Sequence, residues 1–130
     1  MKILAFAEQR NNKFKKTAFE VVKAARTIAD QLQAEVVALV VGDSVHAIAG
    51  ELGGYGAHRV RALEDPRLGK YSTTAYAKAI AEIAKKEQAG IIFLSATAMG
   101  KDCGPRVAVK LEAGIAVDCT ALRMDGADII

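Results

Sequence analysis

Val36-Val-Ala-Leu-Val-Val41 is the stretch of this sequence that decides its fold. It is continuously apolar rather than alternating with polar residues, and Gly42-Asp43 follows at once, which predicts a strand buried on both faces. Ile3 to Ala7 and Ile91 to Leu94 have the same character. Strands of this kind are typical of parallel sheets that carry helices on both sides. We therefore expect an α/β domain.

Helices are expected between the strands. In the first, apolar residues recur at three- and four-residue steps up to Leu32, with Thr17 as the cap and Glu20 completing a capping box. Three more are expected from Ser44 to about Leu52, from Ser72 or Thr73 onward, and from near Pro105 to Leu111. Helices at these places would supply the crossovers that a parallel sheet needs.

Two weaker strands complete the expected sheet. Arg59 to Leu63 alternates polar and apolar residues, as expected near a sheet edge, and Ala113 to Val117 is interpreted as a short fifth strand. The most economical arrangement is an open parallel sheet of three layers with the Rossmann-like strand order 3-2-1-4-5, as in adenine nucleotide alpha hydrolase-like folds. Asp125-Gly126 predicts a hairpin turn. Because a further strand then stops at Ile130, we expect the chain to be part of a larger protein.

The composition excludes several classes of protein. The chain has 130 residues, 52% apolar and 25% charged, so it fits one globular domain. Its net charge of +3 comes from scattered lysines, without the basic face of a nucleic-acid-binding protein. No apolar run approaches the roughly 20 residues of a membrane span, and we see no signal peptide. We expect a soluble protein in a reducing compartment, with Cys103 and Cys119 as buried free thiols.

A ligand site in such a sheet lies where the strand order reverses, at the carboxyl ends of strands 1 and 4. After strand 1 the chain has Glu8-Gln-Arg-Asn-Asn12 instead of the G-x-G-x-x-G of a dinucleotide site. Asp43 after strand 2 could suit a ribose hydroxyl, but without those glycines it is more simply a loop residue. The sequence therefore predicts no dinucleotide site here.

The loop after strand 4 contains the candidate site residues. Thr97, Gly100, Lys101 and Gly104 place small residues, a cation and backbone donors at a helix start, which could bind an anion. The alternative is structural: Gly100 and Gly104 allow a tight turn, Asp102 caps the helix, and Arg106 bonds to a neighbouring loop or subunit. Lys101 is not followed by Ser or Thr, so no Walker pattern is present.

Nothing in the sequence predicts a catalytic residue or a metal site. His46 and His58 are expected to be exposed or packing residues, since G-x-S-x-G and other nucleophile arrangements are absent. The two histidines and two cysteines are too dispersed to form a metal-ligand cluster. A small enzyme of this fold would need a catalytic set that the sequence does not supply.

Several motifs together resemble one known family. Residues 97–106 fit the pattern T-x-x-G-[RK]-D-x-x-P-R, and Asp118-Cys-Thr-Ala-Leu122 fits an acidic-x-T-x-L step. The opening strand, Glu8 and the long helix, and the Tyr55-Gly-Ala57 turn agree as well. This combination resembles the alpha subunit of electron transfer flavoproteins. Cys103 and Gly104 depart from the Leu and Ala that the family often has there.

The resemblance implies what the chain is part of. Residues 1–130 would be the N-terminal domain, a scaffold that packs against the beta subunit, and FAD would be bound by a C-terminal domain absent from this chain. The complete protein would carry electrons from acyl-CoA dehydrogenases of fatty acid beta-oxidation, or similar donors, to a membrane quinone oxidoreductase or another acceptor. It would work in the bacterial cytoplasm or the mitochondrial matrix.

The alternative interpretation is a stand-alone nucleotide-binding module resembling universal stress proteins. Those proteins have a G-x2-G-x9-G-[ST] pattern after strand 4. In this sequence Gly104 comes one residue late, and Gly114 is followed by Ile115. ATP or AMP binding by the chain would favour this alternative over the scaffold domain.

Overall fold

The computed structural model describes residues 2–11, 13–95, 97–111, 121–125 and 128–129. Its centre is a sheet in which four strands run parallel in the order β5-β4-β1-β6. These strands are β1 (Lys2–Phe6), β4 (Glu35–Gly42), β5 (Arg59–Glu64) and β6 (Ala89–Phe93). They are the first four strands of the sequence prediction, in the predicted order 3-2-1-4, and β5 lies at the edge as expected.

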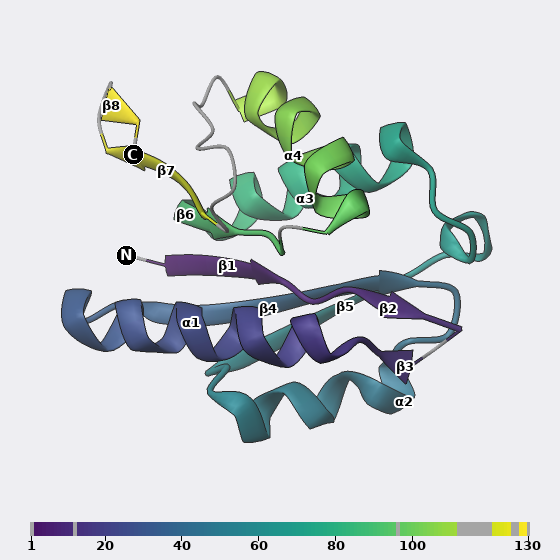
Figure 1. The fold of residues 1–130 in the computed structure, drawn as a ribbon, viewed down its shortest axis with the longest axis horizontal. Helices are drawn as coiled ribbons and strands as arrows, with labels where there is room; N and C mark the ends of the chain where they lie inside the picture. The colour runs from purple at the N-terminus through teal and green to yellow at the C-terminus, as the bar shows by residue number, and fades with distance from the viewer. Residues whose placement is uncertain (1, 12, 96, 112–120, 126–127, 130) are drawn as a thin grey trace.

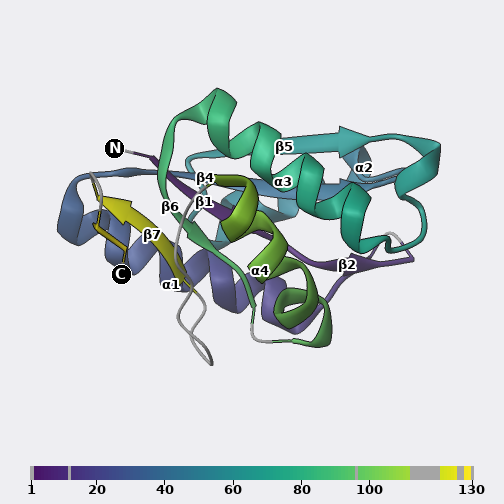
Figure 2. The same ribbon diagram turned by 90° about the horizontal axis from the view of Figure 1, so that it is seen from above.

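Helices cover both faces of the sheet, which makes the fold three-layered (Figure 1). On one face lie α1 (Lys16–Leu32), α2 (His46–Ala49) and the 3₁₀ turn η1 (Gly50–Tyr55). On the other lie α3 (Thr73–Glu87) and α4 (Ala98–Leu111), which pack side by side in Figure 2. A second 3₁₀ turn, η2 (Pro66–Leu68), precedes α3.

The core has two halves because successive strand residues point to opposite faces. Leu4 and Val37 pack toward α3 and α4, whereas Ile3 and Val36 pack toward α1. All four side chains are fully buried. This explains why the central strands are apolar at every position: neither face of the sheet meets water.

The sheet differs from the prediction at its fifth place. The strand beside β6 is β7 (Ala121–Asp125), which runs antiparallel and pairs with β8 (Asp128–Ile129). The predicted fifth strand, Ala113 to Val117, lies outside the described residues. The prediction of a parallel neighbour for β6 was wrong, because residues 121–125, expected only as the first part of the terminal hairpin, occupy that place and run antiparallel. The predicted hairpin around Asp125 is confirmed by the pairing of β7 with β8.

Two helix starts also differ from the prediction. The segment Gln9 to Lys16, expected as a loop, contains a short hairpin of β2 (Gln9–Arg10) and β3 (Lys13–Phe14) that leads directly into α1. Thr17 therefore lies inside α1, and its hydroxyl caps nothing. Likewise Val45 rather than Ser44 precedes α2, without a side-chain cap.

The start of α3 was predicted correctly and that of α4 was not. The Ser72 hydroxyl accepts a hydrogen bond from the Ala75 amide (3.4 Å) and caps α3. Helix α4 starts at Ala98, so Pro105 lies within the helix rather than in its first turn. None of the helices in the described ranges is long and apolar enough to cross a membrane.

Candidate functional site at the strand switch point

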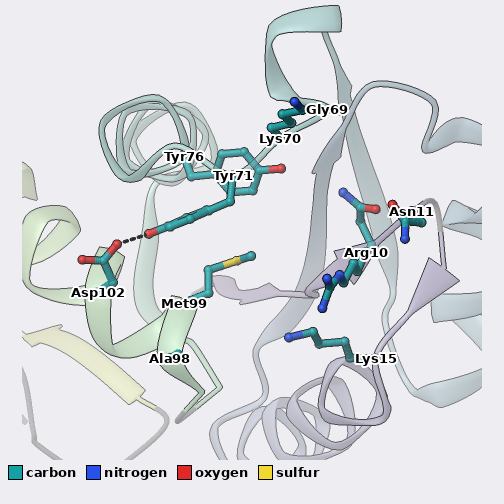
Figure 3. A pocket seen from close by; sticks show the side chains of 11 residues that line it. Arg10, Asn11, Lys15, Gly69, Lys70, Tyr71, Tyr76, Ala98, Met99 and Asp102 are labelled. Atoms are coloured by element: carbon teal, nitrogen blue, oxygen red, sulfur yellow. Dashed lines mark hydrogen bonds between the residues drawn. The ribbon is translucent and has the colours of Figure 1, made fainter.

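A cleft of about 620 Å³ opens at the carboxyl ends of β1 and β6, where the strand order reverses. Three segments that are distant in sequence form it: the β2–β3 hairpin, residues 69–71 before α3, and the first turn of α4 (Figure 3). The sequence predicted this place for a site, because adjacent parallel strands leave a crevice where their connections diverge to opposite faces.

Glu8 lies next to this cleft and holds the segments around it together. Its side chain is fully buried directly after β1. The Thr97 hydroxyl donates a hydrogen bond to Glu8 Oε1, and Lys15 Nζ lies 3.7 Å from Oε2. A buried carboxylate needs such partners, because its desolvation is costly. Glu8 therefore ties the end of β1 to the chain before α1 and the chain before α4.

The first turn of α4 is closed by its own contacts. The Gly100 amide donates to Thr97 Oγ1 (3.1 Å), and the Lys101 amide donates to the Thr97 carbonyl (2.8 Å). A Cβ on Gly100 would lie 1.8 Å from the Ser95 carbonyl oxygen, so only glycine fits. Anion binding by this loop stays a prediction, and these two amides do not support it because both are already bonded.

The structural alternative expected Asp102 to cap the helix. Asp102 instead lies within α4. It accepts hydrogen bonds from the Thr73 hydroxyl and from the Tyr71 hydroxyl (2.7 Å). These bonds, with Thr73 contributing most, lower the pKa of Asp102. Burial, together with the bond to Asp102, raises the pKa of Tyr71 to about 12. Asp102 thus joins the start of α3 to α4 as a carboxylate held by two hydroxyl donors.

Cys103 is confirmed as a buried free thiol. Burial, and then the negative charges of Glu8 and Asp102, raise its pKa to about 11. A thiol of that pKa is almost entirely protonated at neutral pH, and the thiolate is the reactive form. Cys103 therefore packs as a small apolar residue. Cys119 lies outside the described residues.

Arg106 and the two histidines are exposed to solvent. Arg106 is exposed one turn beyond Asp102, and its bond to a neighbouring loop or subunit stays a prediction. His58 is exposed, and its Nδ1 accepts a hydrogen bond from the Val36 amide (2.9 Å). His46 is exposed beside Glu64. Within the described ranges, no three His, Cys, Asp or Glu residues gather as a metal site would require.

The sequence placed one wall of the cleft at the site but not the other. Arg10 belongs to the segment Glu8 to Asn12 after strand 1, although that segment was expected to be a loop and not a hairpin. Tyr71 lies in a connection without periodicity and was not predicted to line the site. The pairing of β2 with β3 positions Arg10, and the bond to Asp102 together with the packing against Tyr76 positions Tyr71 at the same cleft.

Known proteins resemble this chain over nearly its whole length. Residues 3–130 match the family described as electron transfer flavoprotein domain. The electron transfer flavoprotein subunit alpha of Megasphaera elsdenii is 42% identical over 95% of the chain, and that of Bacillus subtilis 31% over 99%. The acryloyl-CoA reductase electron transfer subunit beta of Anaerotignum propionicum is 41% identical over 95% of the chain. The chain spans only 34%, 36% and 39% of the Anaerotignum, Megasphaera and Bacillus relatives, respectively.

Proposed function

Because this chain belongs to the electron transfer flavoprotein family, we propose that residues 1–130 are the N-terminal domain of an alpha subunit, acting as a scaffold and subunit interface. The observation that carries the proposal is the family match across residues 3–130. The relatives' names favour this interpretation over a stand-alone module resembling universal stress proteins.

The chain's own residues do not fit a flavin dinucleotide. In a dinucleotide fold, glycines after strand 1 let the backbone approach the pyrophosphate. Here Glu8 occupies that position as a buried carboxylate. Bringing a pyrophosphate close to it would set like charges together in a place shielded from water. FAD would therefore be held by a part of the protein beyond Ile130, in a domain of roughly 150 to 200 residues.

The role of the whole protein follows from the family. It would be an electron carrier rather than an enzyme, with a beta subunit as its partner. Acyl-CoA dehydrogenases or similar enzymes would donate electrons, and a quinone oxidoreductase or another acceptor would receive them. The compartment would be the bacterial cytoplasm, and the similarity to proteins of Megasphaera elsdenii and Bacillus subtilis supports a bacterial source.

An absorbance spectrum tests the assignment of the cofactor. The purified chain, incubated with excess FAD and desalted, should lack the visible band of bound flavin. A stoichiometric band would show that the cofactor binds here and that the scaffold proposal is wrong. Reading the gene beyond Ile130 provides the second check, because flavin-binding motifs should follow.

A further inference from the structure

The cleft at the strand switch point has one basic wall. Arg10 and Lys15 come from the β2–β3 hairpin and the chain leading into α1, and Figure 3 shows both on the side opposite Tyr71. Lys15 is already compensated by Glu8, at 3.7 Å. Arg10 has no ion pair with any residue of the described ranges. The uncompensated charge of this wall is therefore the Arg10 guanidinium.

The opposite wall is aromatic and held in place. The Tyr71 ring packs edge-on against Tyr76, with centroids 5.1 Å apart, while its hydroxyl is bonded to Asp102. Met99 lies beside the ring in Figure 3. Tyr71 nevertheless remains 38% exposed, although it is a large side chain. An aromatic ring that is both fixed and exposed loses little conformational entropy when a partner covers it.

These features favour a protein segment over a small molecule as the occupant. Ligand pockets bury most of their ligand's surface, whereas the rim residues Arg10, Asn11 and Lys70 are all exposed. A small ligand here would stay largely in water. Tyr, Met and Arg are the residues enriched at the centres of protein interfaces. They are also the residues that form the two walls of this cleft.

We propose that the cleft is an anchor pocket for an acidic segment of the partner subunit. A carboxylate of that segment pairs with Arg10, whose planar guanidinium suits a two-point bond, and its apolar part covers Tyr71 and Met99. The facing carboxylate, Asp102, accepts hydrogen bonds from Tyr71 and Thr73, and no salt bridge among the described residues joins it to Arg10. The identity of the partner as the beta subunit rests on the proposed function.

The test is the affinity of the chain for the beta subunit, measured by calorimetry at low and at physiological salt. Arg10→Glu should weaken binding at least about tenfold, since it replaces an attraction by a repulsion. Lys86→Glu is the matched control: it makes the same change of net charge on an exposed residue at the far end of α3. The circular dichroism melting curve of Arg10→Glu should match that of the parent chain, because no salt bridge among the described residues involves Arg10. Lys86→Glu should melt slightly earlier, since it places a negative charge in the last turn of α3.

Each result decides a different claim. A selective loss for Arg10→Glu that shrinks with added salt supports the pocket. If the parent chain binds and both variants bind equally well, the pocket is wrong and the proposed function stands. If the parent chain does not bind the beta subunit, both fail. If millimolar AMP binds the parent chain but not Arg10→Glu, the cleft is a small-ligand site and the proposal is overturned.

Discussion

Glu87 at the end of α3 should stabilise the fold through its charge. Its carboxylate is only 4% exposed and lies 2.6 Å from Arg59 Nη2, 2.8 Å from Arg61 Nη1 and 3.4 Å from Lys2 Nζ. The pKa of Glu87 is lowered to about 2. The hydrogen bond from Arg61 contributes most to this shift, the bonds from Arg59 and Lys2 add to it, and burial of the carboxylate opposes it. Lys2 lies at the start of β1, and Arg59 and Arg61 lie in the first half of β5. Glu87→Gln would therefore weaken the contacts that hold the amino-terminal ends of these two strands to α3.

The magnitude and its pH dependence follow from this lowered pKa. A shift from 4.5 to about 2 corresponds to about 3 kcal/mol as an upper bound. Because the three cations are 38–47% exposed, screening by water reduces the expected loss in Glu87→Gln to about 1–2 kcal/mol. The folded pKa lies below the unfolded one, so this stability is present above pH 4.5 and is lost as the pH falls toward 2.

Urea unfolding of the parent chain and Glu87→Gln at neutral and acidic pH measures this contribution. The difference in free energy of unfolding should shrink as the pH falls. Glu82→Gln is the control, since Glu82 is exposed on the same helix and should change stability little at any pH. A difference that is absent at neutral pH, or independent of pH, would refute the reasoning.

Three further outcomes are expected. Gly100→Ala should destabilise the chain by about 3 kcal/mol, measured by urea unfolding, because its Cβ would lie 1.8 Å from the Ser95 carbonyl; an unchanged midpoint would contradict the close approach. In a Cys119→Ser variant, Cys103 should react with a thiol reagent only after unfolding, since it is buried with a pKa of about 11; fast labelling of the native chain would exclude that burial. Arg106→Ala should weaken association with a beta subunit in a calorimetric titration, and unchanged affinity would count against an interface at this end of α4.

The central sheet could be predicted from the sequence because its strands carry a strong local signal. Residues 36–41 are apolar at every position, and the structure buries them on both faces. The direction of β7 could not be predicted, because it depends on a pairing with β6 and not on the apolarity of its own residues. The start of α4 was missed because Pro105 suggested a first turn, while the actual cap is Thr97.

The site was only partly predictable. The switch point itself follows from the strand order, and Glu8 lies there as expected. The walls of the cleft depend on the packing of segments about 30 to 90 residues apart, which no local pattern encodes. Asp102 illustrates the limit: its position suggested a cap, yet its actual partners, Tyr71 and Thr73, lie in a different segment.

Sedimentation velocity of the 130-residue chain mixed with the beta subunit of its own organism tests the central claim most directly. A scaffold domain of an electron transfer flavoprotein should form a one-to-one complex, and the chain should carry no flavin absorbance before mixing. Two independently sedimenting species at micromolar concentrations would contradict the claim that this domain is the alpha subunit's contribution to the interface.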